Sequence, residues 1–273
     1  MSGLCTISVK LSHPPALDTI DIISKAKYID TSRSMQIRLT RKPVPFPVIG
    51  EALGLRIPGV DVSASGNANN IDGRDHALDG NTIVGPGLSG VGVLSSSDST
   101  DVVNVKKLNI TTSAGVPKIT VDPGMADPAS YIQDYVNAAD YVYTAGTYGS
   151  NMTWGDSTRP VIVYANGQSG DVTFNGTITG WGILVARGTL NLGGNFSFNG
   201  LVITFNDVTI NQDTLALGGK GTPDVLGAIL AAGNTNSDVI LKGNTQVSYS
   251  SAALNLAKYI NKLQVYRVLQ WYE

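Results

Sequence analysis

The sequence predicts an all-β-dominated protein: a right-handed, three-sided parallel β-solenoid (β-helix) with one inserted helix and a C-terminal capping helix. Glycine is abundant, with 31 among 273 residues, and the C-terminal half of the chain repeats itself. Charged residues make up only 15%, compared with about 25% in an average globular protein. With 42% hydrophobic residues the chain can bury a core, which excludes wholesale disorder.

We expect residues 1–50 to form N-terminal strands and a proline-rich turn that pack on the solenoid. Residues 4–10 and 35–41 are expected to be paired strands, because basic and apolar side chains alternate from Met35 to Arg41. The turn is the Pro-Val-Pro-Phe-Pro segment at 43–47. The first 60 residues hold eight Lys or Arg against four acidic residues. This basic strand face indicates a solvated surface, and a docking surface for an acidic partner is the alternative.

The solenoid is expected to cover residues 51–273, with an early coil near 54–67. Four similar apolar segments begin at Val161, Ile183, Leu201 and Ala228, at spacings of 22, 18 and 27 residues. A second and a third short segment follow each of them; the third segments include 177–179, 195–198, 214–217 and 245–249. Three short strands per unit of about 20 residues, separated by Gly and Asn, are typical of a β-solenoid coil.

A sandwich of antiparallel hairpins is the alternative β architecture. It requires two-residue turns between long consecutive strands, whereas these strands are about four residues long and similar ones recur at every third segment. We therefore favour stacked parallel strands and expect the following residues to be buried: Ile183, Val185, Phe196, Phe198, Val202, Val208, Ile210, Ile229, Val239 and Leu241.

Two helices interrupt the β pattern. A helical insertion is expected near 127–144, because Asp127-Pro128 is a helix-start signal and apolar residues from Ile132 to Val142 follow at helical spacing. The C-terminal cap is expected near 250–273, as a helix that begins at Ser250 or Ser251 and then a strand that closes the final coil. A solenoid end exposes strand edges and apolar core, so it needs such a cap.

Scarce residue types limit the chemistry. Cys5 is the single cysteine, so the chain can form neither an internal disulfide nor a thiolate zinc site. The two histidines, His13 and His76, leave little material for a catalytic triad and are expected to be ordinary surface residues. There is no phosphate-binding loop or dinucleotide fingerprint, and charged residues of the repeats fall mostly at turns. We therefore predict no enzyme activity, no catalytic residue and no cofactor.

The acidic loop at 70–81 is the one candidate for a metal site. Asp72, Asp75, Asp79 and Asn81 offer the hard oxygen ligands that Ca²⁺ prefers. Their spacing does not match an EF-hand, and such side chains also cap backbone N–H groups in turns. We expect a structural, metal-free loop and keep calcium as the alternative.

Partner classes are limited by charge and hydropathy. The formal net charge of −2 argues against nucleic-acid binding. No apolar run approaches the length of about 18 residues needed to span a bilayer. The first ten residues also lack the basic segment and apolar segment of a secretory signal.

Several motifs resemble a known family. They include Val-Asp-Val-Ser-Ala-Ser-Gly-Asn from Val60, Gly-Thr-Ile-Thr-Gly-Trp-Gly from Gly176, and Tyr-Arg-Val-Leu-Gln-Trp from Tyr266. Over roughly residues 35–273 the chain resembles the soluble region of bacterial type IV pilus assembly proteins of the PilX kind and related uncharacterised β-solenoid surface proteins. Members of that family usually begin with a prepilin-like hydrophobic helix, which this sequence lacks. No catalytic residues are assigned in the family, so none carry over.

The resemblance implies a non-enzymatic, extracellular structural or adhesive protein that is associated with the pilus or the bacterial cell surface. The expected partners are other surface or pilus proteins, with self-association as a further possibility. A carbohydrate-binding or carbohydrate-cleaving β-helix protein is the alternative. A groove lined by Trp, Tyr and acids on one face would favour the alternative, whereas faces of Thr, Ser and Asn would favour the structural role.

Overall fold

The computed structural model describes residues 4–11, 19–66, 69–206, 214–217, 222–233 and 237–272. The chain divides into two compact units: Met1–Pro45 combines with Asn261–Glu273, and Phe46–Ile260 forms the second unit. The boundary between the units lies between Pro45 and Phe46, and residues 261–273 belong with the first 45 residues. Within the described ranges, no helix is both long and apolar enough to cross a membrane.

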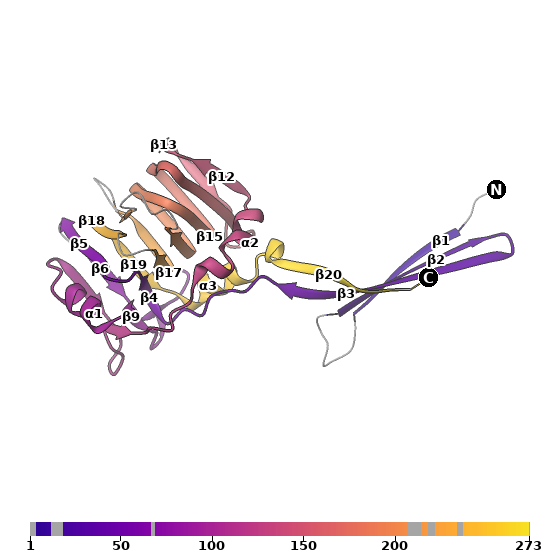
Figure 1. Ribbon diagram of the computed structural model, residues 1–273, viewed down its shortest axis with the longest axis horizontal. Coiled ribbons are helices and arrows are strands. Elements are labelled where there is room, and N and C mark those ends of the chain that lie inside the picture. Colours follow the sequence, from indigo (N-terminus) through magenta and orange to yellow (C-terminus); the bar gives the residue numbers. More distant parts are fainter. Residues whose placement is uncertain are drawn as a thin grey trace. The chain divides into compact units, whose positions relative to one another are not determined.

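The first unit is a four-stranded antiparallel sheet in the order β1, β2, β3, β20 (Figure 1). A 3₁₀ turn at Asn261–Leu263 leads into β20. The strands are β1 (Leu4–Leu11), β2 (Thr19–Tyr28), β3 (Thr31–Pro43) and β20 (Gln264–Tyr272).

Two expectations about this sheet are corrected. Residues 4–10 do not pair directly with 35–41, because β2 lies between them and pairs with both β1 and β3. The C-terminal strand does not close a solenoid coil; β20 pairs with β3 instead. Its apolar residues on both faces predicted a buried edge strand. β20 is an edge strand, but its described side chains are exposed, and the pattern carried no information about which sheet it would join.

The second unit is a curled sheet of parallel strands, which Figure 1 shows as nested arcs from β12 to β5. The strands form three rows. The first row contains β12 (Tyr141–Thr144), β15 (Val161–Phe205), β17 (Asp224–Ala232), β4 (Glu51–Arg56), β9 (Ser89–Val93) and β11 (Ile119–Val121).

The other two rows reuse β15 and β17, since these long strands bend through successive turns of the sheet. The second row contains β13 (Gly146–Tyr148), β15, β16 (Thr214–Leu217), β18 (Asp238–Gly243) and β5 (Asp61–Gly66). The third row contains β14 (Met152–Trp154), β15, β17, β19 (Gln246–Tyr249), β6 (Asn69–Asp72) and β10 (Leu108–Thr111).

The order of these rows differs from the order of the sequence. Strands β17, β18 and β19 are the last strands of the second unit in the sequence, and they pair with β4, β5 and β6, which are its first strands. Figure 1 shows these yellow strands between the orange turns of β15 and the purple strands. The chain therefore starts inside the stack, builds outward to β11, crosses to β12 at the opposite end and winds back to its own first strands.

Parallel pairing was expected and is confirmed, which excludes the hairpin sandwich for the described part of 161–250. Residues 61–66 join the stack as the early coil predicted. One assignment within the repeat is wrong: Thr214–Leu217 pairs with 190–192 and 238–241, so it is a second segment of its coil rather than a third. The third segment of that coil is the start of β17.

The predicted core is confirmed at all eight positions that the structure describes. Ile183, Val185, Phe196, Phe198 and Val202 are fully buried, as are Ile229, Val239 and Leu241 to within 1%. Val208 and Ile210 lie outside the described residues. Alternation puts six of these side chains in the core inside the curl: Phe196, Phe198, Val202, Ile229, Val239 and Leu241. Ile183 and Val185 point to the opposite face of β15 from Leu184 and Ala186, so this part of the strand is buried on both faces.

Helices occupy less of the chain than expected. The insertion consists of a 3₁₀ turn at Pro128–Ser130, capped by Asp127, and helix α2 (Ile132–Asn137). Residues 141–144 are strand β12, because Val142 and Tyr143 pair with Tyr164 and Ala165. A further helix, α1 (Ser96–Val103), follows β9, and a short hairpin joins β7 (Asp75–His76) to β8 (Ile83–Gly85).

The C-terminal helix forms where expected but covers a different surface. Helix α3 (Ser251–Lys258) starts at the Ser250 cap and packs against β15 and β17, on the flank of the sheet. The end of the stack at β12–β14 is closed by aromatic side chains instead. Tyr143 and Tyr148 lie over Phe174, and Trp154 donates a hydrogen bond of 2.9 Å from Nε1 to the Tyr143 hydroxyl.

Candidate functional site

The acidic loop between β6 and β8 was the sequence-predicted metal candidate, and its first carboxylate is buried in an ion-pair cluster. Arg74 donates from Nη2 to Oδ2 of Asp72 at 2.6 Å, and His76 Nε2 lies 3.3 Å from the same oxygen. His76 Nδ1 lies 2.9 Å from the carbonyl oxygen of Gly80, and because a carbonyl oxygen can only accept, Nδ1 donates this hydrogen bond. Burial alone would raise the pKa of Asp72, but the hydrogen bonds and charge of Arg74, helped by His76, hold it below its usual value.

His76 was expected on the surface and is instead 4% exposed. His13 and its segment lie outside the described residues. The sequence could not distinguish a surface histidine from a buried one, because the strands that cover this loop come from distant parts of the chain.

Asp75 fixes the start of helix α3. Its Oδ1 accepts a hydrogen bond from the backbone N–H of Ser251 at 2.9 Å, and its Oδ2 accepts one from the Ser251 hydroxyl at 2.7 Å. The Ser250 hydroxyl donates to the carbonyl oxygen of His76 at 2.7 Å. Two residues of the loop thus bind the first turn of a helix that lies about 175 residues away in the chain.

Asp79 and Asn81 form a local turn. Oδ1 of Asp79 accepts from the backbone N–H groups of Asn81 and Thr82, at 2.9 and 2.8 Å, and Oδ2 accepts from the Thr82 hydroxyl. These hydrogen bonds lower the pKa of Asp79 to about 2. The loop therefore uses its carboxylates for three separate structural contacts. Among the residues that the structure describes, no group of three or more His, Cys, Asp or Glu could hold a metal ion.

Glu51 is a buried carboxyl group that sequence reasoning missed. It lies at the start of β4 with 4% exposure. Space for its side chain comes from two glycines of the same row, since a Cβ at Gly54 or Gly92 would lie 2.7 Å from its carboxyl atoms. Burial, with a smaller contribution from the charge of Asp122, raises the pKa of Glu51 to about 7.

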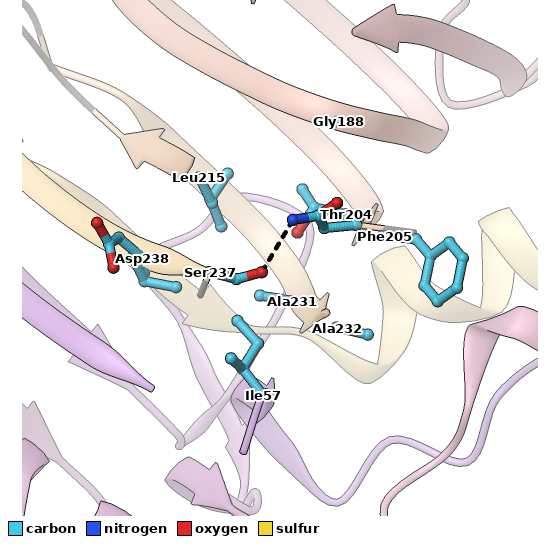
Figure 2. A pocket seen from close by; sticks show the side chains of 11 residues that line it. Ile57, Gly188, Thr204, Phe205, Leu215, Ala231, Ala232, Ser237 and Asp238 are labelled. Atoms are coloured by element: carbon cyan, nitrogen blue, oxygen red, sulfur yellow. Dashed lines mark hydrogen bonds between the residues drawn. The ribbon is translucent and has the colours of Figure 1, made fainter. Parts of the chain in front are cut away.

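A small hollow opens where β15 ends beside β17 and β18. Figure 2 shows Thr204, Ala231 and Ser237 around it, with a hydrogen bond of 3.2 Å from Asn206 Nδ2 to Ser237 Oγ. Its volume is about 10 Å³, which suits one water molecule. Small-molecule sites are typically about 300 Å³ or larger, so this hollow does not bind a substrate.

The four-stranded sheet of the first unit presents two different faces. Register places Lys10, Asp21, Lys25, Lys27 and Arg38 on one face, together with several Ser, Thr and Gln residues. Arg38 binds Asp21 through two hydrogen bonds, of 2.7 Å from Nε and 3.0 Å from Nη2. This face is polar and carries net positive charge.

The opposite face is mostly apolar, and no other element of the first unit covers it. It is lined by side chains of all four strands, which the register places together: Cys5, Ile7, Val9, Ile20, Ile22, Ala26, Tyr28, Met35, Ile37, Leu39, Tyr266, Val268 and Trp271. We call this set the apolar sheet face. Ile7 is 68% exposed, Val9 62%, Val268 60% and Trp271 55%. Among the described side chains of these four strands, none is buried.

This exposure is unusual, because a β-sheet with one apolar face is normally stable only when a second layer covers that face. Contiguous apolar patches on soluble proteins commonly mark interaction sites. The apolar sheet face is therefore the strongest candidate functional site of the described chain.

No protein-family model matches the sequence of this chain, and neither a curated protein nor a solved structure is significantly similar to the chain.

Proposed function

We propose that this chain is a non-enzymatic structural or adhesive protein of the bacterial cell surface, associated with pili in the manner of PilX-like proteins. In this proposal the three rows of parallel strands are the sides of a right-handed, three-sided β-solenoid. The solenoid serves as a rigid body, and the four-stranded sheet is the part that attaches it to other protein subunits.

The observation that carries this proposal is the apolar sheet face. Its four strands are well formed and regularly paired, yet they bury no described side chain. An apolar face of this kind is buried, and the sheet stabilised, when another protein layer covers it, as happens in an assembly. A catalytic role would instead call for a cleft with convergent polar groups.

The outer surface of the solenoid body supports a structural role over carbohydrate binding. Its polar side chains bond to one another between neighbouring strands. Asn191 Nδ2 donates to the Thr173 hydroxyl at 3.2 Å, and Asn109 Nδ2 donates to Asn70 Oδ1 at 2.8 Å. The large aromatic Trp154 lies inside the curl at 1% exposure, where it cannot stack on a sugar ring.

Labelling of intact cells tests the proposal. Antibodies raised against the solenoid body, residues 46–260, should label unpermeabilised cells of the producing bacterium and should co-purify with sheared surface appendages. Labelling that appears only after permeabilisation would contradict a surface location. Micromolar binding of the purified chain to a glycan array would favour the carbohydrate-binding alternative.

A further inference from the structure

We infer that the apolar sheet face is covered by the same face of a second copy of this chain, so that two first units form a symmetric β-sandwich. This inference rests on the proposed function, because it names the partner through which the sheet acts. The missing layer must be apolar, must be flat over four strands and must leave the basic face in water. An identical sheet meets all three requirements.

The distribution of charge determines which face can pair. Lys10, Lys25, Lys27 and Arg38 lie on the polar face with Asp21 as the one acidic residue among its described side chains. Two such faces would repel each other. On the apolar sheet face the register places two charged residues, Arg33 close to the β2–β3 turn and Arg41 opposite Tyr266, towards the other end of β3. Two copies can therefore meet only through the apolar side, where no charge has to be buried at the centre.

The area of the sheet suits a stable dimer. The four strands contain 8, 10, 13 and 9 residues. At a rise of about 3.3 Å per residue and a spacing of about 4.8 Å between strands, they cover about 600 Å². Two copies would then bury about 1,200 Å² in total, which is the lower limit of standard specific interfaces. Two sheets of this size can pack face to face about 10 Å apart, as in a β-sandwich.

A lipid surface fits less well. A sheet that lay with its apolar side in a membrane would hold Lys10, Lys25 and Lys27 on the side away from the lipid headgroups. Anionic membranes attract proteins through basic residues at the headgroup level, so in this orientation the lysines would contribute no attraction to the membrane.

The net charge of the chain also allows two copies to associate. The formal net charge of the whole chain is only −2, so electrostatic repulsion between two copies is weak.

The inference is tested by measuring the molar mass of the full chain by light scattering during size-exclusion chromatography. The wild-type chain should elute as a dimer, at about twice its mass of 28.6 kDa. Val9→Lys with Val268→Lys puts two charges on exposed positions of the apolar sheet face. The dissociation constant should rise by about a hundredfold or more, since each buried lysine would lack a partner.

A matched control variant places the same charges on the same two strands. Ser8→Lys with Gln270→Lys lies on the polar face, at exposed neighbouring positions, and should remain dimeric. A second measurement uses the wild-type chain alone. Trp271 is 55% exposed, so its fluorescence should shift to the red as dilution dissociates the dimer, and Trp271→Phe should remove that shift.

Two results would overturn the inference. A wild-type chain that is monomeric at its highest soluble concentration would refute self-association, and binding of that monomer to phosphatidylglycerol vesicles would identify a lipid partner instead. A dimer that survives the Val9 and Val268 substitutions would be formed by another surface, such as the edge of β1. A monomer that still labels at the cell surface would refute only this inference, whereas a dimer found inside cells would refute only the proposed surface role.

Discussion

At the scale of single residues, the buried carboxyl group of Glu51 makes the folding stability of the second unit depend on pH. Its carboxyl group is buried beside Gly54 and Gly92, and its pKa is raised to about 7. In the unfolded chain the pKa of a glutamate is about 4.3. Well below pH 4 Glu51 is protonated in both the folded and the unfolded chain, so its ionisation does not lower the free energy of unfolding. As pH rises towards 7, only the unfolded state ionises, so folding stability falls and then levels off above pH 7.

Glu51→Gln should therefore stabilise the protein at pH 8 but not at pH 4. The expected gain at pH 8 is about 2–3 kcal/mol in the free energy of unfolding, since the amide carries no charge to desolvate. Urea unfolding at the two pH values measures it, with the wild-type chain as reference so that other titrating groups cancel. An equal difference between variant and wild type at both pH values would mean that burial does not raise the pKa of Glu51.

Glycine is required where the backbones of successive coils touch. Gly200 has φ of 137°, and a Cβ on it would strike the backbone of Gly182; Gly227, with φ of 143°, lies over Gly200 in the same way. Gly200→Ala should cost about 3 kcal/mol or more, because neither the backbone angle nor the space accepts a methyl group.

Gly59→Ala separates the cost of the positive backbone angle from the cost of the missing space. Gly59 also has positive φ, of 66°, but nothing lies within 4 Å of its Cβ position. This variant should lose only about 1 kcal/mol, the usual cost of the left-handed conformation. Both values come from chemical denaturation. Equal losses of stability in Gly200→Ala and Gly59→Ala would mean that the close approach of Gly182 to Gly200 adds nothing to the cost of an alanine there.

At the scale of elements, the acidic loop acts as a clamp for helix α3. Asp75→Ala removes both acceptors of Ser251 and should lower stability by about 1–2 kcal/mol, as loss of a helix cap does. Because each carboxylate already has hydrogen-bond donors, millimolar Ca²⁺ should leave the melting temperature of the wild-type chain unchanged. A rise of several degrees that Asp75→Ala abolishes would establish a calcium site and refute the structural role.

Elements defined by local pattern could be predicted from the sequence, and those defined by partners could not. The short strands after Val161 repeat a pattern of inward apolar residues, so their buried positions followed from alternation. Strand β2 was missed although the Ser-His-Pro-Pro segment at 12–15 is turn-like, because the two-residue turn Ile29-Asp30 that joins β2 to β3 contains neither glycine nor asparagine. The helix signal at Ile132–Val142 continued into β12, because Tyr143 and Val142 suit either a helix face or a strand.

At the scale of the whole molecule, the sequence could not show which coils are neighbours. Consecutive coils stack on each other from β12 to β19, as local repetition predicts. The contact between β17–β19 and β4–β6 joins segments more than 170 residues apart, and nothing in their sequences marks one as the partner of the other. The apolar sheet face was missed for the same reason. Its residues come from both ends of the chain, so the alternation within β3 looked like an ordinary solvated strand.

The pairing of the first coil with the last joins the strands of the second unit into one continuous sheet. Register pairs Ser63 of β5 with Ile240 of β18, and both side chains lie on the outer surface. In a Cys5→Ser background, Ser63→Cys with Ile240→Cys places two thiols on adjacent parallel strands. Their Cα atoms should be about 5 Å apart, which suits a disulfide. The out-of-register control, Ser63→Cys with Lys242→Cys, places them about 8 Å apart, beyond the usual limit.

The most direct test is therefore the extent of disulfide formation in the two double variants, measured on folded protein by non-reducing electrophoresis and confirmed by mass spectrometry of the linked peptides. The stack predicts nearly complete crosslinking between positions 63 and 240 and little between 63 and 242, with an unchanged or higher melting temperature for the first variant. Absence of the 63–240 bond, or equal crosslinking in both variants, would contradict the pairing of the first coil with the last.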